Sequence, residues 1–149
     1  MSRTILTEID LPAAPDAVWA LLADFGRYPQ WNPFVRRITG ETREGAALRI
    51  SLAPRLSWTV GFCANIVAWQ PGKAFAWAGG PHCLLHGRHF FELQASDDGQ
   101  STLLRHGEIF SGMLVRPLLW MLGADPARGY RAMNEAIKRQ LAAAPPAAG

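Results

Sequence analysis

The sequence contains little cysteine and no long hydrophobic run. Its 149 residues include two cysteines, Cys63 and Cys83, which do not form a Cys-x-x-Cys pair. The longest apolar stretch, residues 113–122, is interrupted by an arginine and a proline and falls short of the roughly 20 residues that a membrane span needs. Residues 1–10 carry charges and lack the apolar segment of a secretory leader. We therefore expect a cytoplasmic protein with reduced thiols and no stable membrane insertion.

Charge of one sign is not concentrated anywhere in the chain. The 15 lysines and arginines are nearly balanced by 12 aspartates and glutamates, which leaves a net charge of +3, and no block of five like charges occurs. Basic residues scattered in this way are typical of a solvated surface. We therefore expect no nucleic-acid partner.

The motifs of nucleotide-dependent and covalent catalysis are also missing from the sequence. It has no Gly-x-Gly-x-x-Gly after a predicted strand, no P-loop and no Gly-x-Ser-x-Gly. Neither cysteine stands in a recognisable nucleophile motif. We therefore predict no cofactor and no covalent intermediate.

Short strands dominate what is present. Apolar and polar residues alternate over 3–10, which predicts a strand. A helix is expected over 16–25 after Pro15, and a second short helix or turn holds Tyr28, Trp31 and Phe34. Turn sequences such as Pro71-Gly72 separate the later segments, and links this short make consecutive strands antiparallel. The six later strands are predicted at residues 35–42, 47–52, 57–70, 74–78, 84–95 and 101–110.

The hydrophobic period becomes helical after Gly112. Two apolar stripes follow, over 114–122 and over 130–141, with Gly123 and Pro126 between them. This pattern indicates either two helices or one kinked helix, of which the later part covers residues 126–143. We expect residues 144–149 to form a frayed tail and residues 1–149 to form a single domain.

The order of these elements predicts an α+β fold. A sheet of seven antiparallel strands twists and curls, and the late helix is the element that can cover its concave face. Such a helix contacts a curved sheet at its centre and leaves space near its ends. The space is either filled by side chains or left open as a pocket.

Five segments carry a resemblance to a known superfamily. They read IDLPAAPDAVWALLADFGRYPQWNPF, FAWAGG, HGRHFFEL, STLLRHGEIFSG and GYRAMNEAIKRQL. Together they resemble the polyketide cyclase/dehydrase-like bacterial branch of the START-like, or SRPBCC, superfamily. The resemblance implies a helix-grip fold, in which the sheet wraps around the C-terminal helix. The segment GADPARG departs from the family pattern, because it places a proline where one long helix is usual.

Three polar residues are predicted to face the interior. Strand alternation places His89 on one face with Phe91, and places His106 and Glu108 on one face with Phe110. Three interpretations are open: general acid–base catalysis, a metal site, or polar side chains that satisfy one another. We favour the third interpretation. We predict no metal, because the spacing matches no metal motif. His89, His106 and Glu108 are the candidate catalytic residues.

The predicted ligand contacts are aromatic and aliphatic residues of the inner strand faces and the last helix. Walls of this composition favour a flat or greasy molecule. These residues are Trp58, Phe62, Trp77, Phe91, Phe110, Tyr130, Met133 and Ile137.

The function predicted from these features is binding of a hydrophobic small molecule, such as a lipid, a quinone or an aromatic polyketide. One alternative is a cyclase or dehydratase that uses the histidines and the glutamate as acid–base groups. Another is an interaction module with a closed cavity. The protein is expected to be a monomer or a homodimer.

Overall fold

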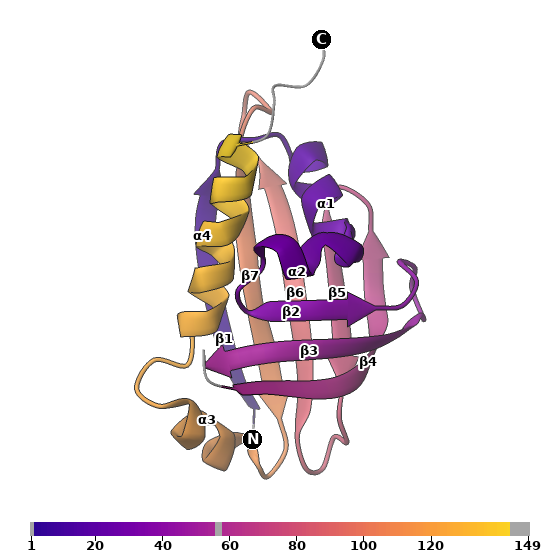
Figure 1. Cartoon of the computed structure of the whole chain (residues 1–149), viewed down its shortest axis with the longest axis vertical. Helices are drawn as coiled ribbons and strands as arrows, with labels where there is room; N and C mark the ends of the chain where they lie inside the picture. The colour runs from indigo at the N-terminus through magenta and orange to yellow at the C-terminus, as the bar shows by residue number, and fades with distance from the viewer. Residues whose placement is uncertain (1, 56–57, 144–149) are drawn as a thin grey trace.

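Seven antiparallel strands form one curved sheet in the computed structural model, which describes residues 2–55 and 58–143. The order across the sheet is β1-β7-β6-β5-β4-β3-β2, so each strand from β2 to β7 pairs with its neighbour in the chain and β1 closes on β7. The strands are β1 (Ser2–Leu11), β2 (Val35–Thr39), β3 (Ala47–Arg55), β4 (Trp58–Gln70), β5 (Ala74–Gly79), β6 (His86–Ala95) and β7 (Thr102–Ser111). The predicted seven-stranded antiparallel sheet is confirmed. In Figure 1, β2 and β3 run across β5, β6 and β7, which shows how far the sheet curls.

Three short helices follow the first strand, as α1 (Pro15–Ala23), the 3₁₀ turn η1 (Phe25–Arg27) and α2 (Tyr28–Trp31). Pro15 occupies the start of α1, where its missing N–H has no partner to lose. The helix expected over 16–25 ends two residues earlier than predicted, and Phe25 lies in the 3₁₀ turn. The two short helices predicted after the first strand are otherwise present.

The chain after β7 forms two separate helices, α3 (Val115–Leu122) and α4 (Arg128–Ala143). Gly123 follows α3 with a φ of 85°, a conformation that glycine adopts without strain. Of the two alternatives that the sequence left open, the structure has the two helices with a connecting segment and not the single kinked helix. Figure 1 shows α4 lying along the sheet and α3 at one end of the molecule. The predicted frayed tail, 144–149, and Ser57, the start of one predicted strand, lie outside the described residues.

The core lies between the concave face of the sheet and the helices. On β7, alternate residues from Thr102 to Phe110 point inward and are buried. On α4, Tyr130, Met133, Asn134 and Ile137 form the buried stripe at helical spacing. Within residues 2–55 and 58–143, no helix has both the length and the apolar character to cross a membrane.

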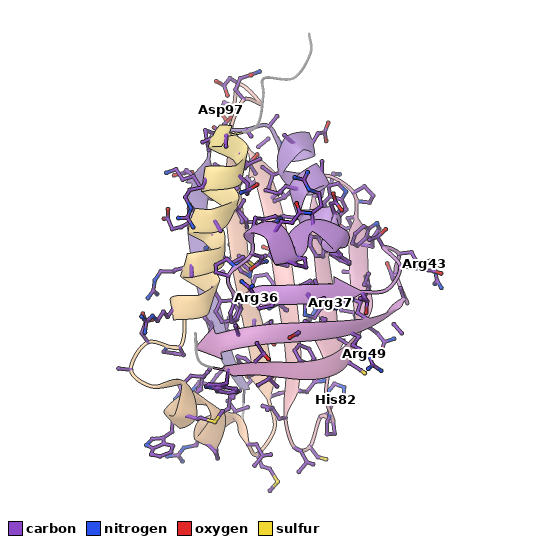
Figure 2. The ribbon with its side chains drawn as sticks, in the orientation of Figure 1. Arg36, Arg37, Arg43, Arg49, His82 and Asp97 are labelled. Atoms are coloured by element: carbon purple, nitrogen blue, oxygen red, sulfur yellow. The ribbon has the colours of Figure 1, made fainter. Side chains whose placement is uncertain are left out.

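Exposed arginines gather on and beside the outer strands β2 and β3. Arg36, Arg37 and Arg49 project from these strands, and Arg43 lies in the loop that joins them (Figure 2). None of the four is among the residues that line the cavity described below. Their separation from the cavity is consistent with a solvated basic surface.

Candidate functional site

A cavity of about 1170 Å³ lies between the sheet, α3 and α4. Its wall is mostly apolar, with Leu118 and Leu122 from α3 and Leu52 and Leu85 from the sheet side. The aromatic residues of the wall are Phe34, Trp58, Phe62, Trp77, Phe110 and Tyr130. The space that a helix across a curved sheet leaves near its ends is therefore open, at the end of α4 that adjoins α3.

Five of the eight predicted ligand contacts line this cavity, namely Trp58, Phe62, Trp77, Phe110 and Tyr130. Phe91, Met133 and Ile137 do not line it, and each is completely buried among core side chains. The Phe91 ring stacks on Phe75 with centroids 4.7 Å apart and on His106 with centroids 4.4 Å apart. Met133 and Ile137 lie further along α4, beyond the end of the helix that reaches the cavity.

Strand pairing brings the three candidate catalytic residues together. In the antiparallel register of β6 and β7, His89 lies opposite Glu108 and Phe91 lies opposite His106. Directly paired residues project from the same face of a sheet, so His89, His106 and Glu108 become neighbours. His89 is 1% exposed, His106 is 0% exposed and Glu108 is 8% exposed, but only Glu108 lines the cavity.

Helix α4 completes a continuous chain of buried hydrogen bonds. The Tyr130 hydroxyl donates to Glu108 Oε2 over 2.5 Å, and Glu108 Oε2 lies 3.3 Å from His89 Nδ1. The Nε2 atoms of His89 and His106 are 2.8 Å apart, and His106 Nδ1 lies 2.7 Å from Asn134 Oδ1. The ring nitrogens of the two histidines thus face each other or a neighbouring oxygen.

The far end of the chain reaches the first strand. Asn134 Nδ2 donates to Thr7 Oγ1 over 2.8 Å, and the Thr7 hydroxyl donates to the His106 carbonyl oxygen over 2.7 Å. Thr7 can take part because β1 pairs with β7 in a register that places Thr7 opposite His106. The chain therefore links β1, β6, β7 and α4.

Burial changes the proton affinity of two members of the chain. Desolvation holds the pKa of His106 well below its usual range, and a positive charge on His89 would lower it further. Burial raises the pKa of Tyr130 well above its usual range, and the adjacent Glu108 carboxyl adds to this rise. His106 is therefore a neutral imidazole, and Tyr130 keeps its hydroxyl proton.

Two glycines make room for the site. A Cβ atom at Gly87 on β6 would collide with Glu108 Oε1, and a Cβ atom at Gly129 on α4 would collide with the Phe34 ring. The Phe34 ring in turn packs against Tyr130 with centroids 4.8 Å apart. The absence of a side chain at Gly87 therefore leaves space for the Glu108 carboxyl group. Its absence at Gly129 leaves space for the Phe34 ring that packs against Tyr130.

Sequence reasoning did not assign Thr7, Gly87 or Asn134 to the site. Asn134 offered one signal, because it lies one helical turn after Tyr130 on the buried face of α4. Thr7 is 99 residues from His106 in the chain, and nothing local marks it. In the described part of the chain, no group of three His, Cys, Asp or Glu residues has an arrangement that could hold a metal ion.

Residues 2–142 match the family described as polyketide cyclase / dehydrase and lipid transport. The chain belongs to this family. The match spans nearly all of the described residues and agrees with the resemblance seen in the sequence motifs. No curated protein matches this chain.

Solved structures share the fold at low sequence identity. An aromatase/cyclase, Zhui, from Streptomyces sp. R1128 has a TM-score of 0.77 at 16% identity, over 95% of this chain and 94% of that chain. A START superfamily protein from Mycobacterium smegmatis has a TM-score of 0.69 at 18% identity, over 93% and 98% of the two chains. Norcoclaurine synthase from Thalictrum flavum has a TM-score of 0.70 at 10% identity, over 95% of each chain. These similarities establish the helix-grip fold.

Proposed function

We propose that this protein binds a hydrophobic small molecule in the cavity between the sheet, α3 and α4. The observation that carries the proposal is the combination of a cavity of about 1170 Å³ with an aromatic wall and a buried carboxyl group, that of Glu108. The other carboxyl group of the wall, that of Asp125, is half-exposed and pairs with Arg131. A cavity of this size argues against the alternative of a closed interaction module. Lipids, quinones and aromatic polyketides all have the apolar body that such a wall accommodates.

The bound molecule also carries a polar group that meets Glu108. Oε2 of this carboxyl group is occupied by His89 and Tyr130, whereas Oε1 has no hydrogen-bond partner among the described residues. A buried carboxyl oxygen without a partner, in a mostly apolar cavity wall, favours a ligand that places a hydroxyl group there. The expected ligand is therefore amphipathic, with a hydroxyl or an enolic oxygen at one end.

The expected affinity is micromolar. Burying roughly 300 Å² of apolar ligand surface contributes about 7 kcal/mol at about 25 cal/mol per Å². The loss of translational and rotational freedom offsets part of this contribution. A hydrogen bond to the Glu108 carboxyl group adds about 1.5 kcal/mol, or roughly tenfold in the dissociation constant.

A pair of probes tests both the apolar and the polar part of the proposal. Naphthalene and 2-naphthol are titrated into the protein, and quenching of tryptophan fluorescence reports binding because Trp58 and Trp77 line the cavity. We expect both probes to bind, with 2-naphthol roughly tenfold tighter. The Glu108→Gln variant should lose most of this preference while it still binds naphthalene.

The matched control is Glu92→Gln, on the same sheet. Glu92 bonds to Arg105 at a half-exposed position and does not line the cavity. Its replacement should leave both affinities and their ratio unchanged. Failure of both probes to bind the wild-type protein contradicts the proposed function. An unchanged preference in Glu108→Gln contradicts the assignment of Glu108 as the polar contact.

A further inference from the structure

The order of hydrogen-bond donors in the buried chain can be derived from its far end. The His106 carbonyl oxygen only accepts, so the Thr7 hydroxyl proton is committed to it. Thr7 Oγ1 must then accept from Asn134, which directs the amide nitrogen of Asn134 toward Thr7. Asn134 Oδ1 therefore faces His106 and only accepts, so His106 carries its proton on Nδ1.

The next steps of the chain follow from this tautomer. Because the buried His106 is neutral, its Nε2 is a lone-pair acceptor, and His89 donates from Nε2 over 2.8 Å. His89 Nδ1 then faces Glu108 Oε2 at 3.3 Å with one proton between them. That proton belongs either to an imidazolium beside a carboxylate or to a carboxylic acid beside an imidazole.

The His89–Glu108 pair, which shares this proton, reaches the cavity only through Glu108. His89 and His106 are enclosed, with exposures of 1% and 0%, and neither lines the cavity. Glu108 lines it, and the absence of a side chain at Gly87 leaves room for Oε1. A purely structural hydrogen-bond network has no need of an unpaired carboxylate oxygen at a cavity wall.

We propose that Glu108 is a catalytic acid–base residue that enolises a hydrophobic ketone bound in the cavity. The inference rests on the proposed ligand binding and adds a substrate class to it: an apolar ketone with a C–H bond next to the carbonyl group. His89, His106 and Asn134 are positioning residues, which hold the shared proton of His89 Nδ1 and Glu108 Oε2 behind the reacting oxygen. Tyr130 fixes Oε2 and leaves Oε1 to react.

The step balances without a co-reactant. Glu108 Oε1 takes the α-proton, the C–H electron pair becomes a C=C bond, and the carbonyl π pair moves to oxygen as an enolate. The protonated carboxyl group then delivers the same proton to the enolate oxygen, which gives the enol and restores the carboxylate. The proton held between His89 Nδ1 and Glu108 Oε2 stabilises the negative charge that passes from the carboxyl group to the enolate.

The first test needs no ligand. The protein has four histidines, and nitrogen-15 NMR of their side chains distinguishes an Nδ1–H imidazole from an Nε2–H imidazole. We expect His106 to be a neutral Nδ1–H tautomer, and expect this preference to be lost in Asn134→Leu, which removes the acceptor. An Nε2–H tautomer at His106 in the wild-type protein overturns the inference.

The second test measures the reaction on a defined probe, α-tetralone. Proton NMR in deuterium oxide follows loss of the α-CH₂ signal, and tryptophan quenching measures binding in parallel. We expect the wild-type protein to accelerate exchange and Glu108→Gln to reduce the acceleration at least about 100-fold with affinity changed only a few-fold. Asn134→Leu should shift the pH–rate profile, which a merely structural role would leave in place. Glu92→Gln should match the wild type.

A second pair of variants leaves every buried ionisable side chain in place. Gly87→Ala forces the Glu108 carboxyl group to move without changing any titratable group, and should abolish exchange. Gly61→Ala on β4 is the matched control, because a Cβ atom there meets its nearest neighbour, the Ile50 carbonyl oxygen, at 3.9 Å. Binding of α-tetralone without exchange overturns this inference and leaves the proposed function standing. Absence of binding by α-tetralone and both naphthalene probes overturns the two together.

Discussion

Acidification should destabilise the protein through His106. This side chain is completely buried and neutral in the folded state, and burial holds its pKa well below the usual value. In the unfolded chain the imidazole titrates near its ordinary pKa of about 6.5. Below that pH the unfolded state binds more protons than the folded state, so the free energy of unfolding falls as the pH falls.

The size of the effect follows from linkage. A histidine that stays neutral when folded but titrates at about pH 6.5 when unfolded removes about 2 kcal/mol of stability between about pH 8 and about pH 5. The loss then grows by about 1.4 kcal/mol for each further pH unit until the folded state also takes up the proton. Such a loss is a large part of the stability of an ordinary domain.

The assay is urea unfolding followed by tryptophan fluorescence across this pH range, in the wild type and in His106→Gln. Glutamine keeps a donor and an acceptor for His89 and Asn134 but does not titrate. The other ionisable groups are common to both proteins, so the difference between their pH profiles reports the titration of His106 together with its coupling to His89, which lies 2.8 Å away. Parallel profiles, or a wild type that gains stability relative to the variant at acid pH, would refute the assignment of a buried neutral His106.

Further outcomes follow from the burial or exposure of the tyrosines and tryptophans. Tyr28 and Tyr130, the two tyrosines in the sequence, have pKa values raised by burial, so phenolate absorbance should stay flat beyond about pH 10 and appear only with unfolding. Their stabilisation is lost as the pH rises above about 10, because the unfolded state then releases protons that the folded state keeps. Trp77→Ala should cost about 3–5 kcal/mol in urea unfolding because Trp77 is 2% exposed. Trp120→Ala should change stability by less than about 0.5 kcal/mol because Trp120 is 84% exposed.

Local chemistry explains why so much of the sheet could be predicted. Turn sequences such as Pro71-Gly72 end one strand and begin the next, and strands joined by short links can only be antiparallel. Alternation along β6 and β7 then places His89, His106 and Glu108 on one face, as the structure has them. These features depend on a few neighbouring residues, so the sequence displays them directly.

The sequence does not show in this way at which level along a strand or helix a residue lies relative to the cavity. Phe91 shares a face with His89, and Met133 lies one turn from Tyr130, yet both are packed into the core at a level that the cavity does not reach. Periodicity reports which side of a strand or helix is buried, and it carries no information on where a helix leaves the sheet. The contact of Thr7 with His106 depends on the closing of β1 against β7, which joins residues 99 positions apart.

The buried chain of hydrogen bonds carries a cost in folding stability. Removing charged and polar groups from water carries a desolvation cost of several kcal/mol per ion, and apolar side chains of similar size often fill such positions with equal or greater stability. Every ring nitrogen of His89 and His106 has a partner, as do Tyr130, Asn134 and Thr7. Glu108 differs, because one of its oxygens has no hydrogen-bond partner among the described residues and the residue lines the cavity. This contrast, between enclosed members that are all satisfied and one unpaired oxygen at the cavity wall, is the observation on which the proposed proton exchange with a bound molecule rests.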